Sequence, residues 1–470
     1  MHPLRQILST AHTAGPSRTA LIHDGKHWSY AELEALVEQT VLGLQQLGVA
    51  AGSAVGIALP SSPELVAAYF AIWELNAVVV EANPSLSAND IREMFCRTGV
   101  VATVGGDGLE TPGIVDGERS MISSPYATQA ACVNLTSGST GAPKGVLLSS
   151  HNLLRNAELF AKYFALRDDD RTCLVLPLYF GMNKIALLAH VRLGATVLLE
   201  PGFATPNTAL AAMHRERATG LCAVPATCQA LLSRGDLARY PQPHLRYLRI
   251  GAGRVPTAMM NGLKRAFPST EIYLTYGLTE IGLVTCLSAA EFALKPESVG
   301  RPIDEVGLVI HGEGDAAGEV VLQGDHAALG YYGDPDGTAA VFQEDGLHTG
   351  DLGRVDRDGY LYLTGRLKEL IKSGGENIYP AEIEAVLLAH EAVADCAVIG
   401  IPDRWLGEAV QAYVALRPDV DVSVPDLMRY CVGTLPPIRR PKRIVLIDHI
   451  PRNAVGKVRR DELPDWSVVA

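Results

Sequence analysis

The sequence predicts an α/β protein with a large N-terminal domain and a small C-terminal domain. From about residue 130 to 280, short apolar runs alternate with helical patterns, which is typical of βαβ units and a mostly parallel sheet. After Gly365 a second alternation runs for about a hundred residues, enough for a separate α+β domain. The length of 470 residues allows roughly three domain-sized units and a large buried core.

The large domain is expected to contain two parallel-sheet α/β subdomains. Residues 1–130 suggest helices at Ala31–Leu47 and Glu64–Leu75 around a strand at Ala54–Leu59. Further along, a helix is expected at Lys184–Val191, and strands at Cys132–Thr136, Cys173–Pro177, Ala195–Leu199, Leu221–Val224, Leu245–Ile250 and Glu271–Thr275. Ligands of parallel sheets lie beyond the carboxyl ends of the strands. The loops after Thr136, Pro177, Ile250 and Thr275 should therefore converge on one site.

The pattern changes to short strands with Gly and Asp turns between about residues 297 and 364. Strands at Val306–Ile310 and Gly318–Leu322, and a hairpin leading into Tyr360–Leu363, predict a small β-barrel that completes a large domain of residues 1–364. Residues 369–470 should form the small domain. Its expected elements are a helix opened by Pro380, strands at Ala394–Ile401 and Ala409–Leu416, a helix near Pro425–Leu435 and a strand at Ile444–Ile447.

Composition narrows the class of function. The net charge of −12 argues against nucleic-acid and anionic-membrane partners. No uninterrupted apolar run approaches the ~20 residues of a membrane span, and residues 1–20 lack the apolar core of a signal peptide. The eight cysteines form no C-x-x-C pair and read as small buried hydrophobes in a reducing compartment. A cytoplasmic protein is expected.

The most informative segment runs from Leu135 to Val146 and reads LTSGSTGAPKGV. Glycines allow backbone N–H groups to approach a ligand closely, while the hydroxyls and Lys144 add donors and a positive charge. This combination suits a polyphosphate. The segment differs from the phosphate loop of nucleoside triphosphatases, because Gly145 follows the lysine where that loop has Ser or Thr.

The order of these residues resembles the phosphate-loop signature of the adenylate-forming superfamily, which includes acyl-CoA synthetases, peptide-synthetase adenylation domains and luciferases. The resemblance implies binding of ATP with Mg²⁺. It assigns ATP or AMP contacts in this loop to Thr136, Ser137, Gly138, Ser139, Thr140, Gly141 and Lys144.

Further segments match the same superfamily in order, up to residue 458. In Tyr276-Gly277-Leu278-Thr279-Glu280, the resemblance implies Tyr276 near adenine, Thr279 on phosphate and Glu280 on the metal. It also counts Gly277 among the residues that bind ATP or AMP. Gly251, Ala252 and Gly253 would form a wall against adenine and the acyl group. Asp351 would bind the ribose hydroxyls, and Arg366 the ribose or phosphates.

Three C-terminal features complete the resemblance. Residues 365–368 would be a hinge with Lys368 as its pivot, so that the small domain is mobile. Gly374, Gly375 and Glu376 would line the tunnel for the thiol. Lys457 would be the catalytic lysine of acyl-AMP formation, and Thr279 and Glu280 would be the other catalytic residues of this step. The small domain would then rotate, withdraw Lys457 and admit the thiol of CoA.

The acid itself is left open. The resemblance implies an acyl pocket at Tyr179, Phe180, Asn183, Ile281 and Gly282, with room for an aryl or medium-length acyl group. Lys184 could pair with a second anionic group on the acid, or be an ordinary structural or surface lysine. An acid–CoA ligase is favoured; the alternatives are loading of the phosphopantetheine of a carrier protein, transfer to a non-thiol acceptor, and a nucleotide-binding regulatory protein without turnover.

Overall fold

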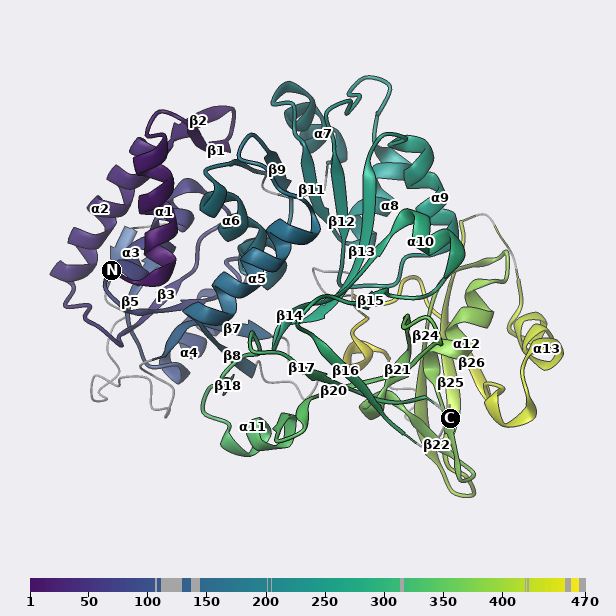
Figure 1. Ribbon diagram of the computed structural model, residues 1–470. Helices are drawn as coiled ribbons and strands as arrows, with labels where there is room; N and C mark the ends of the chain where they lie inside the picture. Colours follow the sequence, from purple (N-terminus) through teal and green to yellow (C-terminus); the bar gives the residue numbers. More distant parts are fainter. Residues whose placement is uncertain are drawn as a thin grey trace. The chain divides into compact units, whose positions relative to one another are not determined.

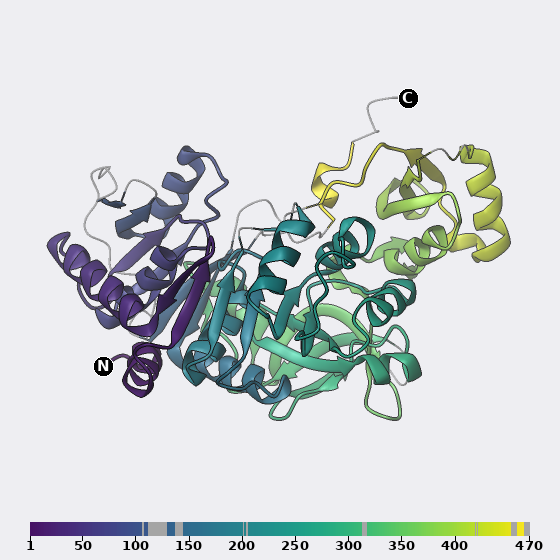
Figure 2. The ribbon, with the colours of Figure 1, turned by 90° about the horizontal axis from the view of Figure 1, so that it is seen from above.

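The computed structural model describes residues 1–105, 108–110, 129–136, 144–200, 202–203, 205–312, 317–418, 420, 422–452 and 458–464. The chain forms two compact units (Figures 1 and 2). Unit 1 comprises Met1–Val306 with Gln323–Glu344, and unit 2 comprises Gly307–Leu322 with Asp345–Ala470. Among the described residues, no helix combines the length and the apolar character needed to cross a membrane.

Unit 1 contains a nine-stranded sheet with the order β15-β14-β13-β12-β11-β9-β10-β1-β2. The strands are β1 Thr19–His23, β2 Lys26–Ser29, β9 Arg171–Leu174, β10 Thr196–Leu199, β11 Gly220–Ala223, β12 Tyr247–Ile250, β13 Glu271–Leu278, β14 Gly282–Ser288 and β15 Arg301–Pro302. The run from β13 to β1 is parallel, and β2, β14 and β15 are antiparallel additions at its ends. The central parallel strands are buried on both faces, as the apolar runs predicted.

A second, seven-stranded sheet in unit 1 has the order β18-β8-β7-β4-β3-β5-β6. Its strands are β3 Ala54–Ile57, β4 Val78–Glu81, β5 Val100–Gly105, β6 Gly108–Glu110, β7 Ala130–Thr136, β8 Lys144–Ser149 and β18 Gly330–Tyr331. Strands β7, β4, β3 and β5 are parallel. The expectation of two parallel-sheet subdomains is therefore confirmed.

The membership of the sheets differs from the sequence expectation in one respect. The strand before the phosphate loop, β7, joins the N-terminal strands, whereas β9, β12 and β13 belong to the nine-stranded sheet, which also takes in β1. One sheet does not carry all four loops. Strand pairing between segments far apart in sequence decides this, and apolar periodicity alone contains no information about it.

One apolar core joins the two sheets through the helices between them. It includes Val55 and Val79 from one sheet, Leu174 and Tyr247 from the other, and Phe160 from α5. Figure 1 shows α5 and α6 between the two sheets, and α7, α8 and α9 along the nine-stranded sheet. The helices of unit 1 are α1 Pro3–Ala14, α2 Tyr30–Gln46, α3 Pro63–Glu74, α4 Ala88–Arg97, α5 Ser150–Tyr163, α6 Gly181–Leu193, α7 Pro206–Arg215, α8 Pro225–Arg234, α9 Thr257–Ala266, α10 Ala289–Leu294 and α11 Pro335–Val341.

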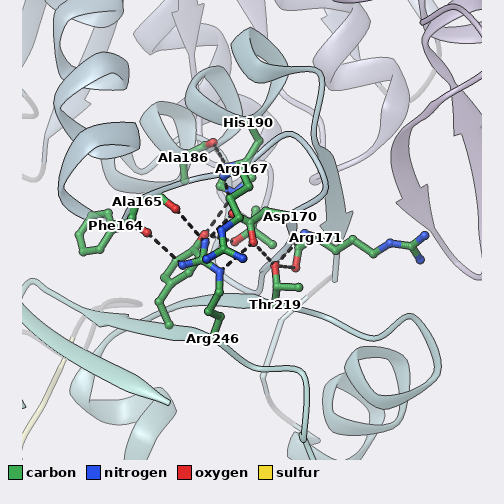
Figure 3. A network of polar contacts seen from close by, with 11 residues as sticks. Phe164, Ala165, Arg167, Asp170, Arg171, Ala186, His190, Thr219 and Arg246 are labelled. Atoms are coloured by element: carbon green, nitrogen blue, oxygen red, sulfur yellow. Dashed lines mark hydrogen bonds and ion pairs between the residues drawn. The ribbon is translucent and has the colours of Figure 1, made fainter. Parts of the chain in front are cut away.

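The buried carboxylate of Asp170 links the amino ends of the central strands through hydrogen bonds (Figure 3). Asp170 accepts hydrogen bonds from Arg246 Nη2 at 2.6 Å and from Thr219 Oγ1 at 2.7 Å. Burial acts to raise the pKa of Asp170, but the hydrogen bonds from Arg246 and Thr219 outweigh it and hold the pKa below its usual value. The network thus ties β9, β11 and β12 together at the end opposite to the candidate site.

Unit 2 contains two sheets. β16 Gly307–His311, β17 Gly318–Gln323, β20 Gly346–Val355 and β21 Leu361–Arg366 pair in that order. The expected hairpin is present between β20 and β21, but closure of these strands into a barrel stays a prediction. The second sheet contains β22 Ile371–Ser373, β23 Glu376–Ile378, β24 Val393–Asp403, β25 Gly407–Leu416 and β26 Arg443–Leu446.

Two helices cover the second sheet of unit 2. α12 Pro380–Leu388 begins with proline at its first turn, and α13 Val424–Thr434 begins with a capping box at Ser423. Ile383, Leu387 and Leu427 of these helices are fully buried against strands such as β24 and β25. The α+β pattern expected for residues 369–470 is thus present. The exact division at a hinge of residues 365–368 stays a prediction.

The cysteines depart partly from expectation. All eight are free. Six are buried as predicted, but Cys96 is exposed and Cys286 is half-buried. Cys96 lies in the last turn of α4, a helix that buries only Phe95, so its position on the helix places it toward solvent.

Candidate functional site

The candidate phosphate loop is the connection of a β-hairpin. β7 and β8 are antiparallel, and Thr136 is paired with Lys144 at the mouth of the hairpin. Ser137, Gly138, Ser139, Thr140 and Gly141 lie outside the described residues, as does the side chain of Thr136. The two strands fix both ends of the loop to the seven-stranded sheet. Gly145 is needed here, because a Cβ would lie 2.8 Å from Val133 Cγ1 and 3.2 Å from Tyr332 Cβ.

Lys144 lies among groups that hold it without burying it. Its Nζ lies 3.5 Å from Asp334 Oδ2 and 4.8 Å from the ring centroid of Tyr331. The Lys144 and Asp334 side chains are both 40% exposed, so this ion pair is screened by solvent. The ammonium group is thus partly exposed to solvent at the end of the hairpin.

Tyr331 connects Lys144 with the candidate metal ligand Glu280. The Tyr331 hydroxyl donates a hydrogen bond of 2.8 Å to Glu280 Oε1. Burial and the Glu280 carboxylate raise the pKa of Tyr331 well above its usual value, so the hydroxyl stays protonated and remains a donor. A carboxylate held by one oxygen leaves the other free for Mg²⁺, whose preferred ligands are oxygens.

Most of the segment Tyr276–Glu280 belongs to a strand, although the sequence predicted a loop after Thr275. β13 continues through Leu278, and Tyr276 and Gly277 are paired with Thr285 and Leu283 of β14. A bulge between Tyr276 and Gly277 shifts the register before the pairing ends at Leu278, and a Cβ at Gly277 would overlap the carbonyl of Gly282. The strand extends because β14 supplies an antiparallel partner, which left Thr279 and Glu280 in the turn.

Two asparagines of α5 position this turn, Asn156 by direct hydrogen bonds and Asn152 through the segment Ala327–Ala328. Asn156 Nδ2 donates to the carbonyl of Ile281 at 3.1 Å, and Leu283 N donates to Asn156 Oδ1 at 3.1 Å. Asn152 Nδ2 donates to the carbonyl of Ala327, and Ala328 N donates to the carbonyl of Glu280 at 2.6 Å. The helix that begins after the phosphate-loop hairpin thus positions the turn of residues 279–281, which we call the metal-ligand turn after the candidate metal ligand Glu280. Sequence reasoning missed both asparagines, since a polar residue within a helix carries no distinctive signal.

The glycine segment after β12 forms a tight wall. Gly251 is buried, and a Cβ there would lie 3.1 Å from both Met182 Sδ and Thr275 Oγ1. Ala252 has a φ of 63°, which is uncommon for a residue with a side chain. Both Ala252 and Gly253 are exposed, so this part of the segment faces outward.

The candidate acyl residues lie at the N-terminus of α6 and beside the metal-ligand turn. The ring centroids of Tyr179 and Phe180 are 4.5 Å apart, and Phe180 occupies the N-cap position of α6 without a capping hydrogen bond from its side chain. Asn183 is fully buried and donates from Nδ2 to the carbonyl of Leu176 at 2.6 Å. Ile281 is buried, and Gly282 has a φ of 87° next to Asn156.

Lys184 has a structural environment. It is fully buried, forms an ion pair with Glu81 and donates a 2.6 Å hydrogen bond to Asn134 Oδ1. Tyr69 donates a further hydrogen bond to Glu81. Of the two readings of Lys184, the structure favours the structural one, although the lysine is buried and not at the surface. It links α6 to β4 and to β7, directly before the phosphate loop.

The candidate ribose residue Asp351 lies in unit 2. Asp351 Oδ1 lies 2.7 Å from Arg366 Nε, and the two residues are paired across β20 and β21. Gly350, which precedes Asp351, has a φ of 67°, and its N–H donates a hydrogen bond of 3.0 Å to Glu319 Oε1. Asp351 and Arg366, which the sequence places fifteen residues apart, are therefore brought together.

The other candidate residues of unit 2 lie in exposed segments. Lys368 lies in the short 3-10 helix Leu367–Glu369. Partial burial lowers the pKa of Lys368, and the positive charge of Arg366 lowers it further. Gly374 and Gly375 form the turn between β22 and β23 with φ values of 58° and 85°. Glu376 follows them and is exposed. Lys457 lies outside the described residues.

Comparison with known families identifies the chain. A family model described as "AMP-binding enzyme" matches residues 8–332, and one described as "AMP-binding enzyme C-terminal domain" matches residues 382–457. The chain belongs to the AMP-binding enzyme family. The resemblance deduced from the ordered motifs is thereby confirmed.

Individual relatives extend along nearly the whole chain. The 2-succinylbenzoate–CoA ligase of Bacillus mycoides is 30% identical over 95% of both sequences. The 3-[(3aS,4S,7aS)-7a-methyl-1,5-dioxo-octahydro-1H-inden-4-yl]propanoyl:CoA ligase of Mycobacterium tuberculosis is 31% identical, over 95% of this chain and 96% of that protein. The o-succinylbenzoate CoA synthetase (MenE) of Bacillus subtilis, solved with the acyl-adenylate OSB-AMP, has a TM-score of 0.85 at 29% identity and covers 98% of both chains. The same enzyme has been solved with ATP and a magnesium ion.

Proposed function

We propose that this AMP-binding enzyme is an acid–CoA ligase. The carboxylate of a small acid attacks the α-phosphorus of Mg·ATP, which forms the acyl-adenylate and releases pyrophosphate. The thiol of CoA then attacks the acyl carbonyl and releases AMP. The observation that carries the proposal is the near full-length relation to proteins named as CoA ligases, one of them solved with an acyl-adenylate.

In the first half-reaction, the proposal gives unit 1 the handling of the phosphates. Lys144 supplies a positive charge at the end of the phosphate-loop hairpin, and Glu280 supplies a carboxylate oxygen for Mg²⁺. Tyr331 fixes the orientation of that carboxylate. In the proposal Thr279, in the same turn, binds phosphate. Tyr276 and Gly277 of β13 and the segment Gly251, Ala252 and Gly253 serve the adenine and the acyl group.

The proposal gives unit 2 two tasks. Asp351, oriented by Arg366, accepts hydrogen bonds from the ribose hydroxyls. Lys457 neutralises the charge that develops on the carboxylate and the α-phosphate, whereas the turn at Gly374–Glu376 serves the thiol in the second half-reaction. Lys368 is the proposed pivot of the change between the two. ATP, Mg²⁺ and CoA are the required small molecules, and the free thiols fit a cytoplasmic location.

Pyrophosphate exchange tests the proposal. The full chain is incubated with ATP, labelled pyrophosphate and a panel of aryl, fatty and dicarboxylic acids, and every acid that supports exchange is then supplied with CoA. Exchange followed by an acyl-CoA product supports the ligase. Exchange without acyl-CoA formation contradicts CoA as acceptor and points to a carrier protein or a non-thiol acceptor. An absence of exchange together with intact ATP binding contradicts acid activation for the whole panel.

A further inference from the structure

Arg249 is a buried cation without a counterion. It lies in β12, its side chain is enclosed, and only 7% of the residue is exposed. Its Nε donates a hydrogen bond of 3.3 Å to Thr275 Oγ1, and its Nη1 is buried without a hydrogen-bond partner. An unpaired buried charge is strongly unfavourable, so an arginine in this state requires an explanation.

Arg249 differs from two other arginines of unit 1, the buried Arg5 and the half-buried Arg246, which are neutralised. Arg5 is 5% exposed and forms ion pairs with Glu34 and Glu74. Arg246, three residues before Arg249, forms an ion pair with Asp170 at 2.6 Å (Figure 3). The described residues place no carboxylate within ion-pair distance of Arg249.

The groups around Arg249 are uncharged at neutral pH. Cys222 and Cys286 lie near the guanidinium, and burial raises the pKa of their thiols to about 11 and about 12. The rings of Phe160 and Phe164 lie 5.1 Å and 5.7 Å from Arg249 Cζ. Aromatic faces attract a cation weakly, and they hold the planar guanidinium in place without neutralising it.

The position of Arg249 connects it with the candidate acyl site. Alternate residues of a strand share a face, so Tyr247, Arg249 and Gly251 lie on the same side of β12, about 7 Å apart in succession. Thr275 Oγ1 accepts the hydrogen bond from Arg249 and is also the atom that a Cβ at Gly251 would meet at 3.1 Å. Arg249 thus lies two residues before the wall glycine on the same face of β12, and its guanidinium packs on Phe160 and Phe164 at the end of α5.

We propose that Arg249 is a specificity-determining residue that binds a second, distal anionic group of the acid, so that the substrate is a dicarboxylic acid. The inference rests on the proposed function and defines the class of acid. A carboxylate accepts two parallel hydrogen bonds from a guanidinium, which would satisfy Nη1 and neutralise the buried charge together. A monocarboxylic acid of the same length would leave the cation unpaired.

The test compares matched acids in wild type and in Arg249→Met, which removes the charge and keeps an apolar side chain of similar length. Linear dicarboxylic acids of increasing length are each compared with the methyl-terminated acid of the same length. The readout is kcat/KM for pyrophosphate exchange. Wild type should prefer the best dicarboxylic acid at least about 10-fold, and Arg249→Met should lose or reverse this preference. Arg254→Met, which removes an exposed charge paired with Glu297 near the same wall, should keep it.

The remaining outcomes separate this inference from the proposed function. Exchange with the same acid preference in wild type and Arg249→Met overturns the inference and leaves the ligase proposal standing. If no acid supports exchange, the binding of the dicarboxylic acids in the presence of AMP is measured by calorimetry in wild type and in Arg249→Met. Binding to wild type that is lost in Arg249→Met supports the anionic site. Binding that is absent in wild type, or equal in the two proteins, overturns it. A purely structural Arg249 predicts a lower melting temperature for Arg249→Met, whereas removal of an unpaired cation should maintain or raise it.

Discussion

The hydroxyl of Tyr331 lies 2.8 Å from Oε1 of Glu280, and its ring lies beside the ammonium of Lys144. Tyr331 belongs to β18, a two-residue strand that pairs with β8 and follows the metal-ligand turn by about fifty residues. A single aromatic side chain therefore contacts both the phosphate-loop lysine and the candidate metal ligand. The sequence offered only the pair Tyr331-Tyr332 after a glycine, which carries no assignable chemistry.

Replacement of Tyr331 by Phe should weaken the use of Mg²⁺. The substitution removes the hydrogen bond that orients Glu280 and preserves the ring beside Lys144. We expect the exchange rate to fall by about 10-fold or more, with a higher Mg²⁺ requirement, because hydrogen bonds to charged groups are worth about 1.5–3 kcal/mol. Exchange is measured across a Mg²⁺ titration. Tyr240→Phe, at a distant part of unit 1, is the control, and an unchanged Mg²⁺ dependence of Tyr331→Phe would remove Tyr331 from this role.

Replacement of Asp351 by Asn should weaken ATP binding. The amide keeps the shape of the side chain but loses the charge that pairs with Arg366 and that, in the proposal, accepts from the ribose hydroxyls. A loss of affinity of about 10-fold is expected from the loss of charged hydrogen bonds. Calorimetry with ATP and with inorganic triphosphate separates the two contributions, since only ATP carries ribose. Equal losses for both ligands would contradict the ribose assignment.

The buried pair of Lys184 and Glu81 should be essential for stability. Lys184→Met leaves the Glu81 carboxylate buried without its cation, which costs about 3–5 kcal/mol. The midpoint of urea denaturation should fall clearly. The double variant Lys184→Met/Glu81→Gln removes both charges and should recover much of the loss. Equal destabilisation by the single and the double variant would show that the ion pair is not the cause.

His348 should make the stability of unit 2 depend on pH. Its hydrogen bonds to Glu319 and Asp345 raise the pKa of His348 above the value of an unfolded histidine, although partial burial opposes this. The stabilisation is complete below the unfolded pKa of about 6.5 and is lost as the pH rises through the folded pKa. The melting temperature of wild type relative to His348→Gln should therefore decrease between pH 6 and pH 9. A constant difference would refute the assignment.

Local patterns predicted most of the elements, because caps and turns are local. α2 starts at Tyr30 after the capping residue Ser29, within a residue of the expected start, and the β20–β21 hairpin turns at Gly359 with a φ of 82°. Sheet membership could not be predicted in this way. β1 pairs with β10, and Leu21 lies opposite Val197, 176 residues further along the chain, so that local patterns do not reveal the pairing.

The residues of the candidate site also fall into those that local sequence predicts and those that only long-range contacts reveal. Motif order placed Lys144, Glu280 and Asp351, whose neighbours in the sequence carry the signal. The residues that act through distant contacts were missed: Asn156 binds the turn at Ile281, and Arg249 is defined by the partner that it lacks. Burial decided the reading of Lys184, because nothing in the sequence distinguishes a solvated lysine from one paired with Glu81.

The most direct test of the account measures the two half-reactions of Lys457→Ala separately. Acyl-adenylate formation is followed by pyrophosphate exchange, and thiolysis by release of AMP from supplied acyl-AMP with CoA. The account predicts that exchange falls by about 10²–10³-fold while thiolysis remains close to wild type, and that Lys442→Ala, which removes an exposed lysine paired with Asp403, affects neither. Equal loss of both half-reactions in Lys457→Ala, or full retention of exchange, would contradict it.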